Sequence, residues 1–216
     1  MNRAVIFDFD GTIVDSLAAV IKVFEDVTKR SHRFTPEEIE ELQHKDPLQI
    51  ALELNVPRWR IPGLLIKGRR MFRAHMRSIK VHDGVAEVIN TLHEQGIPLF
   101  VLSTNSRANV QKYLRWHGLD TLFTNIYGNA GVLGKTRKLH IVCKNEGLDP
   151  TTSWYIGDET RDIIGAHGAG LKVIAVSWGY NSRIALADKG PDALVDTPTE
   201  ILTLLKRAGV AGTIDT

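Results

Sequence analysis

Carboxylate, hydroxyl and amide side chains follow three short apolar segments that lie far apart in the sequence. These clusters are Asp8-Phe9-Asp10-Gly11-Thr12, Ser103-Thr104-Asn105 and Gly157-Asp158-Glu159, the last with Asp162 close behind it. If the apolar segments are strands of one parallel sheet, their carboxyl ends meet at one edge, where such sheets bind ligands. The sequence therefore predicts one site built from three distant segments.

The spacing of the acids predicts that they face one another. Side chains two residues apart on a strand point the same way, so Asp8 and Asp10 would share a face while Phe9 enters the core. Asp158 and Asp162 are four apart and would share one face of a helical turn. Carboxylates this close would repel one another and raise each other's pKa values. Oxygen ligands suit Mg²⁺, which we therefore expect at the site.

Two further side chains favour phosphoryl transfer over hydrolysis by a metal-bound water. A lysine at a helix start, such as Lys135, can neutralise the oxygens of a transferring phosphoryl group, and the hydroxyl of Thr104 can donate to them. Each has a simpler interpretation when taken alone. Lys135 could be a solvated surface lysine, and Thr104 could be a helix N-cap, a position for which Ser103 and Ser106 compete.

The elements that must position these residues alternate between strand and helix. The expected buried strands are Ala4 to Phe9, Leu99 to Leu102, Asn125 to Tyr127, Trp154 to Ile156, Lys172 to Val176 and Ala193 to Val195. Helical patterns at Gly84 to Gln95 and Arg107 to His117 lie between some of them. Alternation of this kind predicts an α/β fold with a doubly wound parallel sheet covered on both faces.

A long helical segment interrupts this alternation after the first strand. Helices are expected at Asp15 to Arg30, Glu37 to Gln43, Pro47 to Leu54 and Leu64 to Ser78. Thr35, Pro36 and Glu38 form a capping-box pattern before the second of them. We expect a core of residues 1–15 and 81–216 and a small all-helical cap of residues 16–80.

The composition is that of a globular protein with no evident macromolecular partner. Apolar residues make up 43% of the 216 residues, enough for a full core, and the net charge of +2 does not indicate nucleic-acid binding. The single cysteine, Cys143, cannot form an internal disulfide, which favours a reducing compartment. The N-terminus lacks a signal-peptide pattern, and no apolar run is long enough for a membrane span. We expect a cytoplasmic protein with a small-molecule substrate; the sequence leaves its oligomeric state open.

The motifs resemble those of the haloacid dehalogenase superfamily phosphatases. Asp8 to Ser16 resembles the first motif of that family, Thr104-Asn105 the second, Lys135 the third and Gly157 to Asp162 the fourth. The order is that of the family, and the resemblance extends from about Arg3 to Lys206. It implies a Rossmann-like core with a helical cap after the first strand, and within that branch the likeness is greatest to phosphoglycolate phosphatases.

The resemblance also implies roles for individual residues. Asp8 would be the nucleophile, forming an aspartyl-phosphate, and Asp10 the general acid and base. Thr104, Asn105 and Lys135 would hold the phosphoryl group of a small phosphorylated metabolite. Mg²⁺ would be bound by Asp8, Asp158 and the backbone carbonyl of Asp10, with Asp162 or Glu159 acting through water.

Departures from the family pattern bear on the substrate. Asp83-Gly84 stands where Pro-Gly is common, and Thr136 follows Lys135 where proline is usual. Both leave the identity of the phosphate ester open.

Three other functions fit parts of the pattern. Gly128 to Thr136 ends like a nucleotide-binding P-loop, but Asn129 occupies the position that needs glycine. A receiver-like signalling module would also use aspartate, threonine and lysine, but without a long insert after the first strand. A phosphomutase of the same family is the third alternative, and Thr12 fits the phosphatase pattern better.

A basic stripe in the predicted cap has two interpretations. Its members, at helical spacing, are Arg69, Arg70, Arg73, Arg77 and Lys80, with Leu65, Phe72 and Met76 on the opposite face. A solvated helix face is the simpler interpretation. In the other, the stripe, or His44 and Lys45 in a turn between helices, attracts an anionic substrate.

Overall fold

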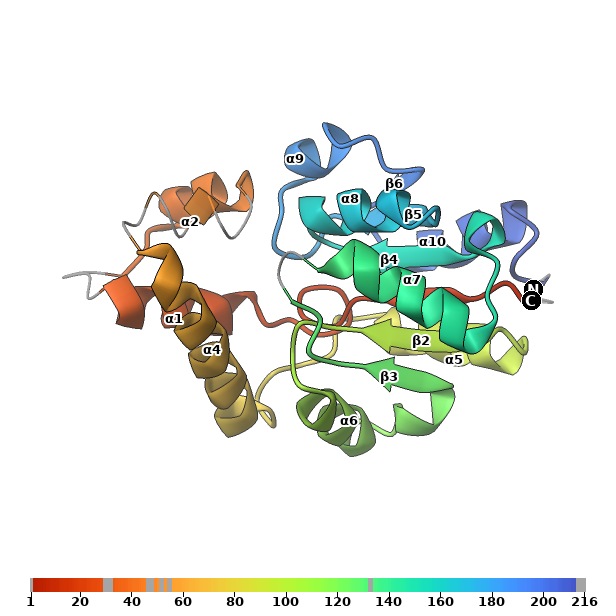
Figure 1. Cartoon of the computed structure of the whole chain (residues 1–216), viewed down its shortest axis with the longest axis horizontal. Coiled ribbons are helices and arrows are strands. Elements are labelled where there is room, and N and C mark those ends of the chain that lie inside the picture. The colour runs from red at the N-terminus through yellow and green to blue at the C-terminus, as the bar shows by residue number, and fades with distance from the viewer. Residues whose placement is uncertain are drawn as a thin grey trace.

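The computed structural model describes residues 2–28, 33–45, 49–50, 53, 56–131 and 134–212. Figure 1 shows a central sheet with helices on both faces and a further group of helices beyond the carboxyl ends of the strands.

The six described strands form one parallel sheet in the order β3-β2-β1-β4-β5-β6. They are β1 (Val5–Phe7), β2 (Leu99–Leu102), β3 (Asn125–Tyr127), β4 (Trp154–Gly157), β5 (Lys172–Val176) and β6 (Ala193–Val195). All six lie where the sequence predicts them. The first is shorter than expected because the chain turns after Phe7, and Asp10 forms an isolated bridge with Val14 instead of extending the strand.

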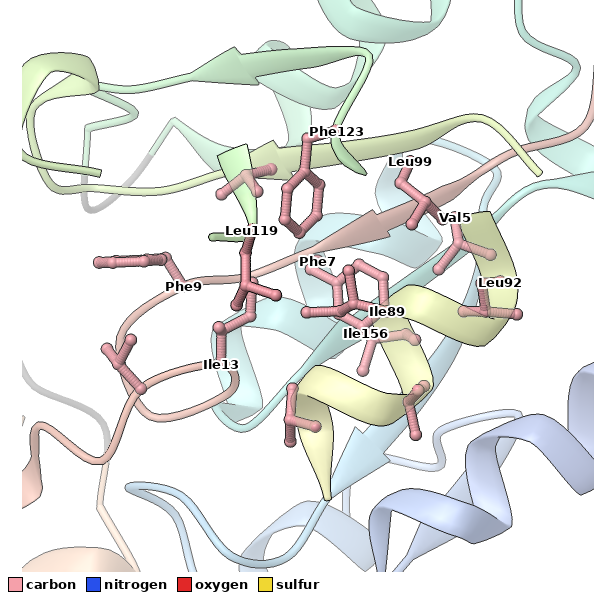
Figure 2. Packing of buried hydrophobic residues seen from close by; sticks show 14 of the residues in the cluster. Val5, Phe7, Phe9, Ile13, Ile89, Leu92, Leu99, Leu119, Phe123 and Ile156 are labelled. Carbon is pink, nitrogen blue, oxygen red and sulfur yellow. The ribbon is translucent and has the colours of Figure 1, made fainter. Parts of the chain in front are cut away.

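Alternating side chains of the strands build two hydrophobic layers, one on each face. Val5 and Phe7 of β1 belong to one layer and Ile6 to the other. Helices α5 (Val85–Glu94), α6 (Arg107–Trp116) and α10 (Pro198–Arg207) cover the first layer, part of which is drawn in Figure 2. Helices α7 (Lys135–Glu146), α8 (Thr160–Gly168) and α9 (Arg183–Ala187) cover the second. The predicted doubly wound α/β fold is confirmed.

Short 3-10 turns complete the core: η2 (Asp120–Leu122) and η3 (Pro150–Thr152). Among the helices in the described ranges, none is both long and apolar enough to cross a membrane.

The helical segment after β1 contains α1 (Leu17–Thr28), α2 (Pro36–Gln43), η1 (Arg58–Arg60) and α4 (Ile61–His75). The Thr35 and Glu38 capping box is present at the start of α2, as predicted. Helix α4 begins before the expected Leu64 because Pro62, which is tolerated in a first turn, lies near its N-terminus. The helix expected from Pro47 to Leu54 lies largely outside the described residues.

Aromatic packing joins α4 to the core. The ring of Phe9 lies 5.6 Å from that of Phe72 in α4 and 5.4 Å from that of Tyr113 in α6, both edge to face. Phe72 and Met76 are buried, as the sequence predicts for that side of the helix. The two segments that connect the helical insert to the core run side by side, since Val14 and Val81 form an antiparallel bridge.

Candidate active site

The buried amine of Lys135 lies between two carboxylates from different strand ends. Asp8 follows β1, and its backbone N–H donates to the carbonyl of Ile156 in β4, which holds it at the centre of the sheet edge. The Nζ atom of Lys135, the first residue of α7, is 2.8 Å from Oδ2 of Asp8 and also pairs with Oδ1 of Asp162. All three side chains are 95% or more buried, with 3%, 5% and 0% of their side-chain surface exposed for Lys135, Asp8 and Asp162.

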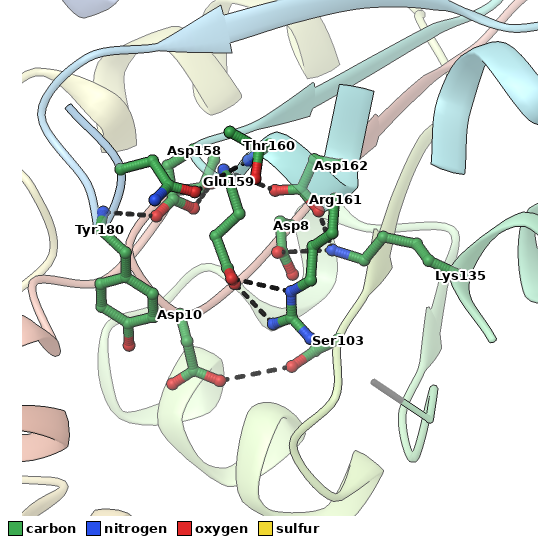
Figure 3. Close-up of polar contacts among 12 residues, drawn as sticks. Asp8, Asp10, Ser103, Lys135, Asp158, Glu159, Thr160, Arg161, Asp162 and Tyr180 are labelled. Carbon is green, nitrogen blue, oxygen red and sulfur yellow. Dashed lines mark hydrogen bonds and ion pairs between the residues drawn. The ribbon is translucent and has the colours of Figure 1, made fainter. Parts of the chain in front are cut away.

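Asp158 completes a buried group of carboxylates. One oxygen from each of Asp8, Asp158 and Asp162 lies within 4.8 Å of the others. Oδ1 of Asp158 accepts a 2.6 Å hydrogen bond from the hydroxyl of Thr12, and Oδ2 accepts one of 2.7 Å from the backbone of Tyr180. Figure 3 shows Asp8, Lys135, Asp158, Asp162 and Tyr180 converging from the segments that follow β1, β4 and β5 and from the first turns of α7 and α8.

Two glycines allow the backbone to approach Asp158 this closely. Gly11 has a left-handed φ of 84°, and a Cβ atom at Gly11 or at Gly179 would collide with the Asp158 carboxylate. The Asp158 side chain is therefore held in one place from two sides.

The electrostatics of this group fit a divalent cation. Burial raises the pKa of Asp8 to about 7, although the charge of Lys135 opposes the shift. Burial and the charges of Glu159, Asp162 and Asp8 raise the pKa of Asp158 well above its ordinary value. Two of the three carboxylates, those of Asp8 and Asp162, pair with one ammonium group, and the donors are all oxygen, the ligand type that Mg²⁺ prefers. The residues present therefore suit Mg²⁺ at this position.

The Asp10 carboxylate has different partners. It accepts hydrogen bonds from the Asn105 amide at 3.3 Å, the Ser16 hydroxyl at 3.4 Å and the Ser103 hydroxyl at 3.5 Å. Burial raises its pKa to about 6, against the lowering effect of the Asn105 bond. Asp10 stands on the turn after β1 and not on the strand itself, while Phe9 enters the core as expected.

Thr104 and Asn105 follow β2 and face α4. The carbonyl of Thr104 accepts hydrogen bonds from Nε and Nη2 of Arg69, at 3.1 and 2.5 Å. Oδ1 of Asn105 accepts from the Asn109 amide at 3.0 Å, and the Oδ1 of Asn109 accepts from Arg73 at 3.2 Å. The loop that carries these residues is therefore tied to α4.

Three members of the basic stripe contact the core. Arg69 and Arg73 bond to the core as described, and the guanidinium of Arg77 lies 4.9 Å from the ring centre of Trp116 in α6. In the turn after α2, Nδ1 of His44 is 2.7 Å from the Ser182 hydroxyl, and Lys45 pairs with Glu53 at 2.6 Å.

Three residues of this site, Arg161, Ser16 and Tyr180, have no role predicted from the sequence. Arg161 makes a two-bond ion pair with Glu159, with Nε–Oε2 and Nη2–Oε1 distances of 2.8 and 2.5 Å. The hydroxyl of Tyr180 lies 2.6 Å from that of Ser16, which in turn bonds to Asp10. Tyr180 follows β5, another strand that ends at this edge, so the rule applied to the other strand ends points to it as well.

Comparison with known proteins places these features in a family. Residues 5–176 match the family model of the haloacid dehalogenase-like hydrolases. The phosphoglycolate phosphatase of Synechococcus elongatus is 34% identical over 93% of this chain and 95% of its own length. A pyrophosphatase of Halalkalibacterium halodurans is 25% identical over 94% of this chain and 96% of its own.

A solved structure shares the whole fold. A haloacid dehalogenase-like family hydrolase from Streptococcus pneumoniae superimposes with a TM-score of 0.78 at 22% identity, covering 94% of this chain and 98% of its own. Since the family model spans residues 5–176, a range that includes Asp8 and Asp158, the predicted family is confirmed. The protein belongs to the haloacid dehalogenase-like hydrolases and is a phosphatase of that family.

Proposed function

We propose that the protein hydrolyses a small phosphate monoester, phosphoglycolate or a close analogue, by way of an aspartyl-phosphate at Asp8, with Mg²⁺ as cofactor. The observation that carries the proposal is the Asp8 carboxylate, buried at the sheet edge against Lys135 and grouped with Asp158 and Asp162. The 34% identity to a phosphoglycolate phosphatase supports the choice of ester.

Asp8 is oriented as a nucleophile. Its Oδ1 accepts a 2.8 Å hydrogen bond from the backbone N–H of Phe9, and its Oδ2 is held by Lys135. Carboxylates of this kind attack phosphorus to form an acyl phosphate. Lys135 neutralises charge on the phosphoryl oxygens, and Thr104 and Asn105 line the same edge to bind them.

Mg²⁺ would be held by Asp8, Asp158 and the backbone carbonyl of Asp10. Both oxygens of Asp162 are engaged, one by Lys135 and one by the backbone N–H of Glu159, so Asp162 would act on the cation through water and would position Lys135. The cation supplies charge neutralisation between the nucleophile and the phosphate.

Asp10 is the proton donor and acceptor. A carboxyl group with a pKa of about 6 can both release and regain a proton near neutral pH. Asp10 would protonate the departing ester oxygen and then take a proton from the water that attacks the acyl phosphate, which returns the carboxyl to its protonated state.

Residues 16–80 would act as a cap over the site, which limits the substrate to a small molecule. The bonds of Arg69 to Thr104 and of Asn181 to the carbonyls of Gln43 and Lys45 support a cap seated on the core. The free thiol of buried Cys143 is consistent with the reducing cytoplasm, where we propose the enzyme acts.

A substrate panel tests the proposal. Phosphoglycolate, pyrophosphate, sugar phosphates and nucleoside monophosphates are assayed with Mg²⁺ against the wild type, Asp8→Asn and, as a control, Asp188→Asn, which changes an exposed aspartate. We expect phosphoglycolate to give the highest kcat/KM, Asp8→Asn to abolish turnover and Asp188→Asn to leave it unchanged. Preferred hydrolysis of pyrophosphate, or isomerisation of a sugar phosphate without release of phosphate, would contradict the assigned reaction.

A further inference from the structure

Arg161 places a positively charged guanidinium inside the active site, and this group has no role in the reaction described above. It lies in the first turn of α8, three residues after Asp158, and only 19% of its side-chain surface is exposed. Figure 3 shows its guanidinium projecting toward the space bounded by Asp8, Asp10 and Ser103. Such a position costs solvation of the charge, which an ion pair offsets.

Glu159 fixes the orientation of this guanidinium and leaves one edge of it open. The carboxylate of Glu159 engages Nε and Nη2, and within the described residues Nη1 donates to no acceptor. Burial lowers the pKa of Arg161, but the charges of Glu159, Asp162 and Asp8 and the hydrogen bonds to Glu159 together raise it above its ordinary value, so the group stays cationic. The remaining N–H groups are therefore preorganised for an anion.

The open edge lies on the leaving-group side of the site. In Figure 3 the guanidinium of Arg161 lies between the Asp8 carboxylate and the side chains of Asp10 and Ser103, while Lys135 reaches Asp8 from a different direction. Asp10 is the residue assigned to protonate the departing oxygen, whereas Lys135 already pairs with Asp8 at the phosphoryl position.

We propose that Arg161 is a specificity residue that binds a carboxylate on the leaving group of the substrate through the guanidinium edge left free by Glu159. This inference rests on the proposed function and deepens it. In phosphoglycolate a carboxylate is attached to the carbon that bears the ester oxygen, so a group that binds it must lie next to the proton donor for that oxygen. A planar guanidinium forms paired, charge-assisted hydrogen bonds with a carboxylate.

The arginines of α4 are less suited to this role. Arg69 directs Nε and Nη2 to the Thr104 carbonyl, and Arg73 bonds to Asn109. Their guanidinium groups tie α4 to the motif loop and to α6, whereas the guanidinium of Arg161 faces the space bounded by Asp8, Asp10 and Ser103 (Figure 3).

A pair of esters that differ only in the carboxylate tests the proposal. Phosphoglycolate is compared with 2-hydroxyethyl phosphate, in which a neutral hydroxymethyl group replaces the carboxylate. We expect Arg161→Gln to lower the ratio of kcat/KM for phosphoglycolate over the neutral ester by about 10- to 100-fold, the value of a charge-assisted hydrogen bond. Arg161→Lys should lose part of this preference, and Glu159→Gln should lose part of it because the guanidinium is no longer oriented.

Two further variants serve as controls. Arg183→Gln breaks an arginine–aspartate pair with side chains 58% and 52% exposed and should leave the ratio unchanged. An equal loss on both esters in Arg161→Gln would overturn the proposal, because Arg161 would then serve the phosphoryl group or the fold. A loss of preference in Arg69→Gln but not in Arg161→Gln would also overturn it.

Binding without turnover separates this proposal from the proposed function. Calorimetry measures the affinity of both esters for Asp8→Asn and for Asp8→Asn combined with Arg161→Gln. We expect the Arg161 change to weaken phosphoglycolate about 10- to 100-fold more than the neutral ester. If the Arg161 change weakens both esters by the same factor, Arg161 is rejected as the carboxylate site even if the aspartyl-phosphate mechanism holds. A larger loss for phosphoglycolate would support Arg161 in this role even if phosphoglycolate proved a poor substrate.

Discussion

The Nζ atom of Lys135 lies 2.8 Å from Oδ2 of Asp8, and both side chains are almost completely buried. The same amine pairs with Asp162, so it is the nearest positive charge for two buried carboxylates. Burial alone raises the pKa of Asp8, and the ammonium group opposes that shift and favours the ionised form needed for attack.

Replacing Lys135 by Met should destabilise the protein by about 3–5 kcal/mol, because it leaves buried carboxylates without a partner. These acids can escape the penalty by binding protons, so the loss of stability should be larger at pH 8 than at pH 5. Thermal unfolding in a chelator at both pH values measures the difference. Lys144→Met, an exposed change on the same helix, is the control. An equal loss at both pH values would show that the carboxylates are not the unpaired groups.

The contribution of this site to the stability of the metal-free protein should fall between pH 5.5 and pH 8. Folding raises the pKa of Asp8 from 3.8 to about 7, mainly by burial. A carboxyl whose pKa is raised by folding contributes stability that is full below its unfolded pKa and is lost as the pH rises through its folded pKa. Mg²⁺ stabilises the folded state it binds, and it should do so more strongly at pH 8, where it need not displace protons.

Differential scanning fluorimetry with Mg²⁺ or a chelator at the two pH values checks this expectation. In Asp158→Asn the increase of Tm caused by Mg²⁺ should be smaller at both pH values. A larger increase of Tm at pH 5.5 than at pH 8 would contradict the assigned cation site.

Thr12 should act on the cation through Asp158. Its hydroxyl donates to Oδ1 of Asp158 over 2.6 Å and orients that carboxylate. Removing a hydrogen-bond partner of a metal ligand typically weakens metal binding about 10- to 100-fold. Thr12→Val should raise the Mg²⁺ concentration for half-maximal activity by that factor, while Thr203→Val on the exposed face of α10 should not change it. An unchanged Mg²⁺ requirement in Thr12→Val would contradict the assignment of Asp158 as a cation ligand oriented by Thr12.

Ser16 should tune the proton donor. Burial is the main cause of the raised pKa of Asp10, and the Ser16 bond lowers it by stabilising the ionised form. Ser16→Ala should therefore move the pKa of Asp10 above about 6 and shift the alkaline limb of the kcat/KM profile for an alkyl phosphate to higher pH. Ser78→Ala, which removes an exposed hydroxyl, should leave the profile in place. A shift to lower pH in Ser16→Ala would mean that another group donates the proton.

Local patterns in the sequence predict the sheet and its edge well. Buried runs such as Val5 to Phe7 and Trp154 to Gly157 fall into strands because both faces of a parallel sheet exclude water. The convergence of Asp8, Asp158 and Lys135 follows from where strands and helices start and end.

Contacts between distant segments could not be predicted in this way. The position of Asp10 depends on a turn closed by Val14. The arginines of α4 bond to the Thr104 loop and to Asn109 in α6, whose approach is set by packing of the whole α4 segment. The pairing of Arg161 with Glu159 requires the first turn of α8 to point both side chains at the site, which residue spacing alone leaves open.

We propose that Asp8 carries the phosphoryl group and that Asp10 moves the protons. Positioned acid–base groups contribute about 10² to 10⁴ in rate, but an activated leaving group such as p-nitrophenolate departs with little help. Asp10→Asn should therefore form the phosphoenzyme from labelled p-nitrophenyl phosphate and hydrolyse it slowly.

Rapid-quench labelling with p-nitrophenyl phosphate and an alkyl phosphate is the most direct test. We predict that Asp10→Asn accumulates labelled protein at Asp8 from the activated ester and that Asp8→Asn never does. Label in Asp8→Asn, or equal slowing of both esters in Asp10→Asn with no labelled protein, would contradict the account.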